Sequence, residues 1–170
     1  MKKPFFSLLF SILCIGTGIL LSASEPVSYG LYTPVFMDRT EMENAVKIEV
    51  AQPLREPGKI YLYGKYILVN EKYKGIHVID NTDPSAPQNL AFLHIDGCID
   101  IAMKNDILYA DNAIDLIALK TTDNFASVQV TERIKNIFPE TGSPDVYWMP
   151  YSVNQFRPKN GIIVAWKKKS

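Results

Sequence analysis

The strongest constraint on the fold is a phrase that occurs twice in the chain. Residues 75–87 read GIHVIDNTDPSAP, and residues 115–127 read DLIALKTTDNFAS. With a shift of 40 residues, 60–95 falls on 100–135 without a gap, and 5 of the 36 paired positions are identical. Identity is low, but apolar runs and turn residues stay in phase. Such a period indicates repeated units that stack on one another.

Each unit contains four short runs that are typical of strands. The runs are rich in β-branched and aromatic residues and are separated by Gly, Asn, Asp and Pro. They lie at 60–63, 66–70, 75–80 and 89–95, and at 99–103, 107–111, 114–119 and 128–134. Four strands in a unit of about 40 residues are typical of a propeller blade. We predict an all-β fold with about two four-stranded, propeller-like blades, at 59–97 and 98–135.

The turn after the third strand explains the repeated phrase. Asp80 ends the strand, and the side chains of Asn81 and Asp83 can hydrogen-bond to nearby backbone. Pro84 and Pro87 fix φ and exclude a helix. We therefore interpret Asp83 as a turn residue and not as a catalytic acid.

Two segments outside the blades lack this pattern. Residues 25–58 are predicted to be irregular, with one possible short helix near Asp38. Residues 136–170 combine a Pro-rich surface excursion with a partial third repeat, GIIVAW, at 161–166.

The first 24 residues have the layout of a secretory signal peptide. A Lys pair precedes an apolar run from Phe5 to Leu21, and small residues, Ser22 and Ser24, precede the expected cut. We expect export to the periplasm, the cell surface or the medium. An uncleaved anchor is the first alternative, since the run is nearly long enough to span a bilayer. A lipoprotein acylated at Cys14 is the second, although Leu13 is large for the position before it. Membrane contact is expected only in these two cases.

Charge and cysteine content argue against a nucleic-acid-binding protein and against a fold stabilised by disulfides. The chain has 18 basic and 18 acidic residues, and loss of Lys2 and Lys3 leaves 16 against 18, a net charge of −2. No basic field is present to hold nucleic acid. After cleavage Cys98 is the single thiol, so the fold cannot rest on an intramolecular disulfide.

Two stretches resemble a known family. PGKIYLYGKYILVNEKYKGIHVIDNTDPSAP (57–87) and GCIDIAMKNDILYADNAIDLIAL (97–119) are similar to the LVIVD-repeat proteins of bacteria. IHVID stands where the namesake strand of that family occurs, followed by its Asp-x-x-Asp-Pro-x-x-Pro turn. The likeness runs from about Tyr32 to Lys168. It implies an exported, often surface-associated, β-propeller-like protein of undetermined biochemical role.

This chain departs from the family by stopping after two full units and a stub. Two blades cannot close a ring, and repeat proteins need about three units for stability. Three arrangements stay open. The chain is a truncated piece of a longer propeller, its blades pack open against the N-terminal segment, or several copies form a ring. We favour the first two, because ring closure needs a defined rotation per subunit.

Metal-binding candidates are weak. His77 and His94 are candidate ligands, joined by Asp96, Cys98 and Asp100. The His94-x-x-x-Cys98 spacing suits a helix, but the strand pattern and Gly97 argue against one there. An acidic series offers a calcium site at a blade edge as an alternative; it comprises Asp96, Asp100, Asp106, Asp111 and Asp115.

Catalytic motifs are lacking as well. The chain has no Gly-x-Ser-x-Gly elbow and no Gly-rich phosphate loop, and TGSPD at 141–145 reads as a turn. We predict no catalytic, cofactor-binding or metal-binding residues and a non-enzymatic binding or scaffold role. An exported hydrolase or metal-dependent enzyme using His77, His94 and Asp residues is one alternative. A fragment without independent function is the other.

Aromatic residues are the remaining candidates for contact with a protein or glycan ligand. They either fill blade interfaces or form an exposed platform. They are Tyr61, Tyr63, Tyr66, Tyr73, Tyr147, Trp148 and Tyr151. We expect the ligand at Asn70–Lys74, Asp111–Ala113 and the 139–160 excursion, and we expect the terminal WKKKS to be solvated.

Overall fold

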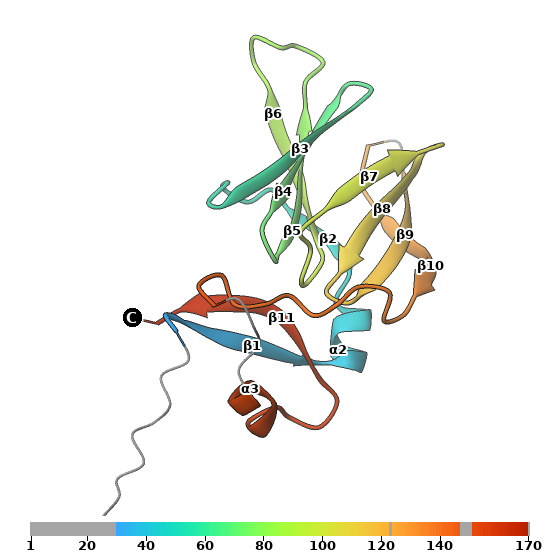
Figure 1. The fold of residues 1–170 in the computed structure, drawn as a ribbon. Coiled ribbons are helices and arrows are strands. Elements are labelled where there is room, and N and C mark those ends of the chain that lie inside the picture. Colours follow the sequence, from blue (N-terminus) through green and yellow to red (C-terminus); the bar gives the residue numbers. More distant parts are fainter. Residues whose placement is uncertain (1–29, 123, 147–150, 170) are drawn as a thin grey trace, which may run out of the picture.

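The computed structural model of the chain describes residues 30–122, 124–146 and 151–169 (Figure 1). Strands dominate these residues and form three antiparallel sheets, of two, four and five strands. None of the three sheets is closed on itself. The prediction of an all-β fold is therefore confirmed.

The first unit forms most of the five-stranded sheet. Its strands are β3 (Pro57–Tyr63), β4 (Tyr66–Glu71), β5 (Gly75–Asp80) and β6 (Gln88–His94). All four predicted strands are present, and they pair in the order in which they follow one another. A fifth strand, β2 (Lys47–Val50), pairs with the outer side of β6.

The second unit forms the four-stranded sheet. Its strands are β7 (Ile101–Lys104), β8 (Ile107–Asn112), β9 (Asp115–Thr121) and β10 (Val128–Ile134). They also pair with their neighbours along the chain. The four predicted strands of this unit are confirmed as well.

The gapless alignment of the two units needs one correction. Glu71 pairs with Gly75 across a three-residue loop, whereas Asn112 pairs with Asp115 across a two-residue loop. Because successive side chains of a strand point to opposite faces, one missing residue reverses which side chains face the core. An alignment with a shift of 40 residues can therefore match the inward-facing residues of the two units on only one side of this loop.

The first predicted turn uses Asp83 as expected, whereas the second side-chain acceptor is Asp80, where Asn81 was expected. Asp83 Oδ1 accepts hydrogen bonds from the backbone N–H of Ser85 (2.9 Å) and from its hydroxyl (2.7 Å). Asp80 Oδ1 accepts one from the N–H of Thr82 (2.8 Å). Both carboxylates therefore close local turns at the exposed end of the sheet.

One hydrophobic core joins the two larger sheets. Its fully buried members from the first unit are Leu68, Ile76, Val78, Leu93 and Ile95, and those from the second are Cys98, Leu108, Ala110, Ile117, Leu119 and Phe125. Each buried Leu, Ile or Val side chain stabilises the fold by about 1.5–3 kcal/mol. Phe125, from the turn before β10, packs edge-on against Tyr66 with the ring centroids 5.1 Å apart.

The strands β3 and β7 lie next to each other where the two sheets meet. Lys59 pairs with Asp100, the Tyr61 hydroxyl donates to the Met103 carbonyl (3.2 Å), and the Tyr63 hydroxyl donates to Asp106. The partners advance together along both strands, so β3 and β7 run in the same direction.

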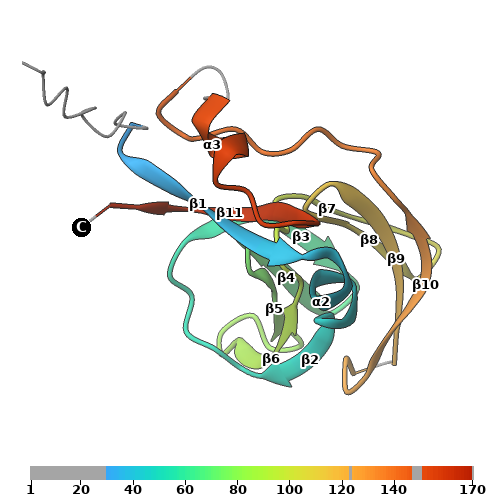
Figure 2. The same ribbon diagram turned by 90° about the horizontal axis from the view of Figure 1, so that it is seen from below.

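The third sheet joins the two ends of the described chain. Strand β1 (Tyr32–Asp38) pairs antiparallel with β11 (Gly161–Lys168), from Tyr32 opposite Lys168 to Asp38 opposite Gly161. This ribbon lies below the two larger sheets in Figure 1 and crosses their ends in Figure 2. The partial repeat at 161–166 is thus a strand, but its partner is β1 and not another repeat strand.

The description of 25–58 as irregular is corrected by β1, β2 and a helix, α2 (Arg39–Asn44). The predicted helix near Asp38 is confirmed, and Asp38 caps it by accepting from the N–H of Thr40 (2.8 Å). Strand β1 contains Pro34; among the described residues β1 pairs with β11 alone, and such an edge strand tolerates proline. A second helix, α3 (Tyr151–Gln155), interrupts the Pro-rich excursion.

Asp115 fastens α2 to the second sheet. This carboxylate is fully buried and accepts from the guanidinium of Arg39 (3.0 Å), the guanidinium of Arg133 (2.9 Å) and the N–H of Asn136 (2.9 Å). Burial opposes its ionisation, but these donors outweigh that cost and lower the pKa of Asp115. Asp115 therefore holds α2, β9 and β10 together.

Replacing Asp115 with Asn should destabilise the protein by about 3 kcal/mol, because two guanidinium groups lose the buried carboxylate that they share. Urea unfolding at neutral pH measures this loss. Glu43→Gln is the matched control: Glu43 also pairs with Arg39 (3.1 Å) but is partly exposed, so its loss should cost less than about 1 kcal/mol. Equal effects of the two substitutions would contradict the role given to Asp115.

Candidate functional site

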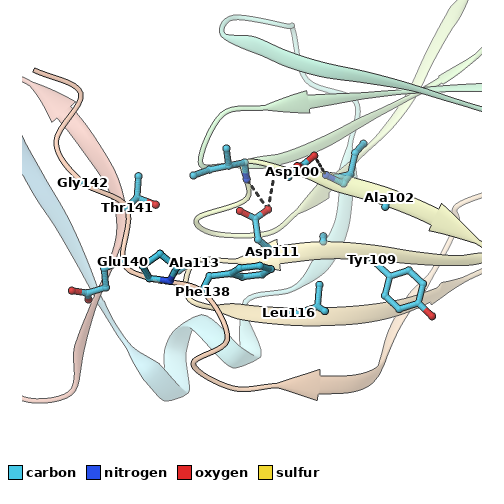
Figure 3. A pocket seen from close by; sticks show the side chains of 14 residues that line it. Asp100, Ala102, Tyr109, Asp111, Ala113, Leu116, Phe138, Glu140, Thr141 and Gly142 are labelled. Carbon is cyan, nitrogen blue, oxygen red and sulfur yellow. Dashed lines mark hydrogen bonds between the residues drawn. The ribbon is translucent and has the colours of Figure 1, made fainter. Parts of the chain in front are cut away.

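Two grooves lie where the chain enters β7. The first, called the apolar groove, has a volume of about 610 Å³ and lies between β7, β8 and the segment 138–142 (Figure 3). The second, called the basic groove, has a volume of about 890 Å³ and lies between the start of β3, the β4–β5 turn and the ribbon. Ile99 lines both grooves.

The loops predicted to contact a ligand border these two grooves. Asn70 and 72–74 line the basic groove, and Asp111 and Ala113 line the apolar groove. The excursion contributes 139–142 to the apolar groove and Pro144 to the basic groove. Segments that are far apart in the sequence therefore meet at one end of the sheets.

Asp111 is a half-buried acid of the apolar groove. Its Oδ1 accepts hydrogen bonds from the backbone N–H of Ile99 (2.8 Å) and of Asp100 (2.7 Å), as Figure 3 shows. Burial raises the pKa of Asp111 above its ordinary value, although these two donors favour the charged form. The carboxylate thus fixes the chain that leads into β7, and this engagement leaves it poorly placed to act on a ligand.

Glu71 performs the same task in the first unit. Its carboxylate accepts from the backbone N–H of Arg55 (3.1 Å) and of Glu56 (2.9 Å), just before β3. Burial opposes its ionisation, but these two donors, with His77 and Lys74, lower the pKa of Glu71 to about 2. An acid at the end of the second strand therefore holds the entry to the first strand in both units.

The two histidines do not meet. His77 is buried on β5, with its Nε2 3.1 Å from Glu71 and its ring against Phe92 (centroids 4.9 Å apart). His94, on β6, lies 3.0 Å from Asp96, and mainly this hydrogen bond raises the pKa of His94. Among the described residues, no group of three or more His, Cys, Asp or Glu side chains could hold a metal ion.

Cys98 is buried in the main hydrophobic core. The amide of Asn70 lies 3.3 Å from its sulfur, and burial raises the pKa of the thiol well above its ordinary value. A protonated, buried thiol is a poor metal ligand and a poor nucleophile. The spacing of His94 and Cys98 therefore does not correspond to a shared site.

The acidic series is dispersed as well. Each carboxylate has its own partner: Asp96 pairs with His94, Asp100 with Lys59, Asp106 with Tyr63, Asp111 with backbone, and Asp115 with two arginines. The series does not converge on one point that could serve as a calcium site.

The aromatic residues of the first unit fill interfaces. Tyr61 and Tyr63 pack against the main core, Tyr66 is buried in it, and Tyr73 packs beside Trp166 in a smaller cluster. Trp166 donates its indole N–H to the carbonyl of Thr141 (2.7 Å). Tyr147 and Trp148, and the side chain of Tyr151, lie outside the described residues.

Sequence reasoning missed three residues that line the grooves. Phe138 lines the apolar groove and is 39% exposed. Lys167 and Lys168 were expected in a solvated tail, but they belong to β11 and line the basic groove. The strand-like run GIIVAW immediately before them was the available signal.

No family model, curated protein or solved structure matches this chain. Across the described part of the chain, neither helix has the length and apolar character needed to cross a bilayer. The expected leader at 1–24 lies outside the described residues.

Glu71→Gln should destabilise the protein by about 1–3 kcal/mol at pH 7, because a buried acceptor of two N–H groups is replaced by an amide. The pKa of Glu71 in the folded protein is about 2, below an unfolded value of about 4.3. Its stabilising contribution is therefore complete above the unfolded pKa and is lost as pH falls towards the folded pKa.

The difference in unfolding free energy between wild type and Glu71→Gln should accordingly shrink between about pH 5 and pH 2. Urea titrations at several pH values measure it. The exposed Glu132 of β10 provides the control substitution, Glu132→Gln, which should change stability little at any pH. If the difference in unfolding free energy between wild type and Glu71→Gln did not change with pH, the low pKa of Glu71 would be contradicted.

Proposed function

We propose that this chain is an exported, non-enzymatic binding module of the cell envelope, built from two propeller-like blades and a closing ribbon. The two larger sheets each contain one sequence unit, with strands paired in chain order. The strands β3 and β7 run side by side in one direction, as the innermost strands of neighbouring blades do in a propeller. The ribbon of β1 and β11 covers one end of this pair.

A repeated irregularity supports the same reading. The pairing of β5 with β6 shifts register next to Val78, and the pairing of β9 with β10 shifts between Val130 and Glu132. Both sheets therefore have a bulge where the third strand pairs with the fourth. Two units that share a bulge as well as a strand order are best explained as two copies of one blade.

The proposed binding role rests on the apolar groove. It is lined mainly by apolar groups, among them Ala102, Leu116 and Phe138. Its carboxylates are engaged elsewhere: Asp111 holds backbone N–H groups, and Glu140 turns away to pair with Arg157 (2.6 Å). A concave apolar surface whose charged groups maintain the fold suits ligand binding better than proton transfer.

The apolar lining favours a protein segment over a glycan as the ligand. Glycans present rows of hydroxyl groups, which need hydrogen-bonding partners when they are buried. Apolar side chains of a protein gain free energy when they leave water for such a groove. The ligand is therefore a protein component of the envelope.

Ala102→Arg should abolish binding of the secreted chain to isolated cell envelopes. Ala102 is exposed on β7 within the groove, so a long charged side chain there occupies the ligand's place without disturbing the core. Co-sedimentation with envelopes measures binding. Ala126→Arg, in the exposed β9–β10 turn, is the matched control and should bind as wild type does. Wild type that stays in the supernatant, or equal binding by all three proteins, would refute the proposal.

Export has a separate test. Residues 1–24 fused to alkaline phosphatase lacking its own leader should give enzyme activity in intact bacteria, because that enzyme folds only in an oxidising compartment. A fusion in which Lys2 and Lys3 are replaced by Glu should lose most of the activity, because the positive segment of a signal peptide is reversed. Activity confined to lysed cells in the first fusion would exclude export.

A further inference from the structure

Lysine side chains are concentrated in the basic groove. The chain as a whole is electrically balanced, with 18 basic and 18 acidic residues, yet five lysines and one glutamate line this groove. The lysines are Lys59, Lys72, Lys74, Lys167 and Lys168, all of them exposed. The local charge therefore differs in sign from the net charge expected for the mature chain.

Three of these lysines have no carboxylate partner among the described residues. Lys59 pairs with Asp100, and Lys74 lies 3.4 Å from Glu71. Across the parts of the chain that the structure describes, Lys72, Lys167 and Lys168 form no ion pair. Uncompensated like charges around a concave surface raise the local positive potential and attract anions.

The wall that carries Lys72 is rigid. The N–H of Tyr73 donates to the Cys98 carbonyl (2.8 Å), and the Tyr73 carbonyl accepts from the N–H of Gly97 (2.9 Å). The Lys72 ammonium group lies over the Tyr73 ring, 5.0 Å from its centroid. The β4–β5 turn thus presents its charge from a fixed backbone, which lowers the entropy lost on binding.

Two strand edges border the groove. In the described residues, β3 is the last strand of the five-stranded sheet, and β11 has β1 as its single strand partner. Pro57–Lys59 and Ala165–Lys168, which belong to these two strands, line the groove. An extended peptide can hydrogen-bond to a strand edge through its own backbone, a match that a polysaccharide does not offer.

We infer that the basic groove binds an extended, acidic peptide segment of a partner protein. Its carboxylates pair with Lys72, Lys167 and Lys168, and its backbone lies along the edges of β3 and β11. This inference rests on the proposed function, that the chain is a binding module, and it assigns a ligand class to a second groove.

Fluorescence anisotropy with a labelled peptide of alternating Glu and Ser tests this inference on the secreted chain. We expect saturable binding that weakens as salt is raised, because exposed charges are screened. A peptide of alternating Lys and Ser should not bind. The double substitution Lys72→Glu with Lys167→Glu should weaken binding of the acidic peptide at least about tenfold, since two attractions become repulsions.

The matched control is Lys104→Glu with Lys120→Glu. These lysines are exposed on β7 and β9 and lie outside the groove, so the peptide affinity should stay within about twofold of wild type. No binding of the acidic peptide, or equal losses in both double variants, would overturn the inference. Binding of polygalacturonate alone, lost with the groove variant, would overturn it too, because the ligand would then be an acidic polysaccharide.

The two proposals fail separately. Suppose that wild type binds envelopes and Ala102→Arg loses that binding, while the acidic peptide does not bind to wild type. In that case the inference about the basic groove is wrong, and the proposal of a binding module stands. If neither probe binds to wild type, both fall.

Discussion

The buried carboxylate of Asp115 is the interaction on which the arrangement of the sheets depends. It sits at the start of β9, yet its partners come from α2 and from the end of β10. An unpaired charge at so buried a position would be strongly unfavourable, so both arginines must be in place when the fold is complete. The N-terminal segment is thereby attached to the second unit and not only to the first.

This attachment determines where the ribbon lies. Asp38 ends β1 and caps α2, so fixing α2 also fixes β1 and its partner β11. Met42 of α2 packs with Ala113, Ile162 and Val164 in a small cluster of its own. Both grooves have one wall on the larger sheets and another on the ribbon or the excursion, so the same ion pairs shape the grooves.

The strands and the first turn could be predicted because they depend on local signals. Alternation, β-branched residues and an Asp-Pro turn located β3 to β10 within a few residues. The pairing of β1 with β11 and the use of Lys167 in a groove could not be predicted, because they depend on contacts between residues more than a hundred positions apart. The loops bordering the grooves were predicted as ligand loops, but the grooves themselves arise from tertiary packing.

The pairing of the first strand with the last has a consequence for synthesis and folding. Each strand from β3 to β10 finds a partner within a short hairpin, so the two larger sheets can form while the chain is still being made. Strand β1 must wait for β11, because Tyr32 pairs with Lys168 and a long loop has to close first. The ribbon is therefore the last sheet to form, and a translation product that ends before Gly161 lacks both the ribbon and the wall of the basic groove that β11 supplies.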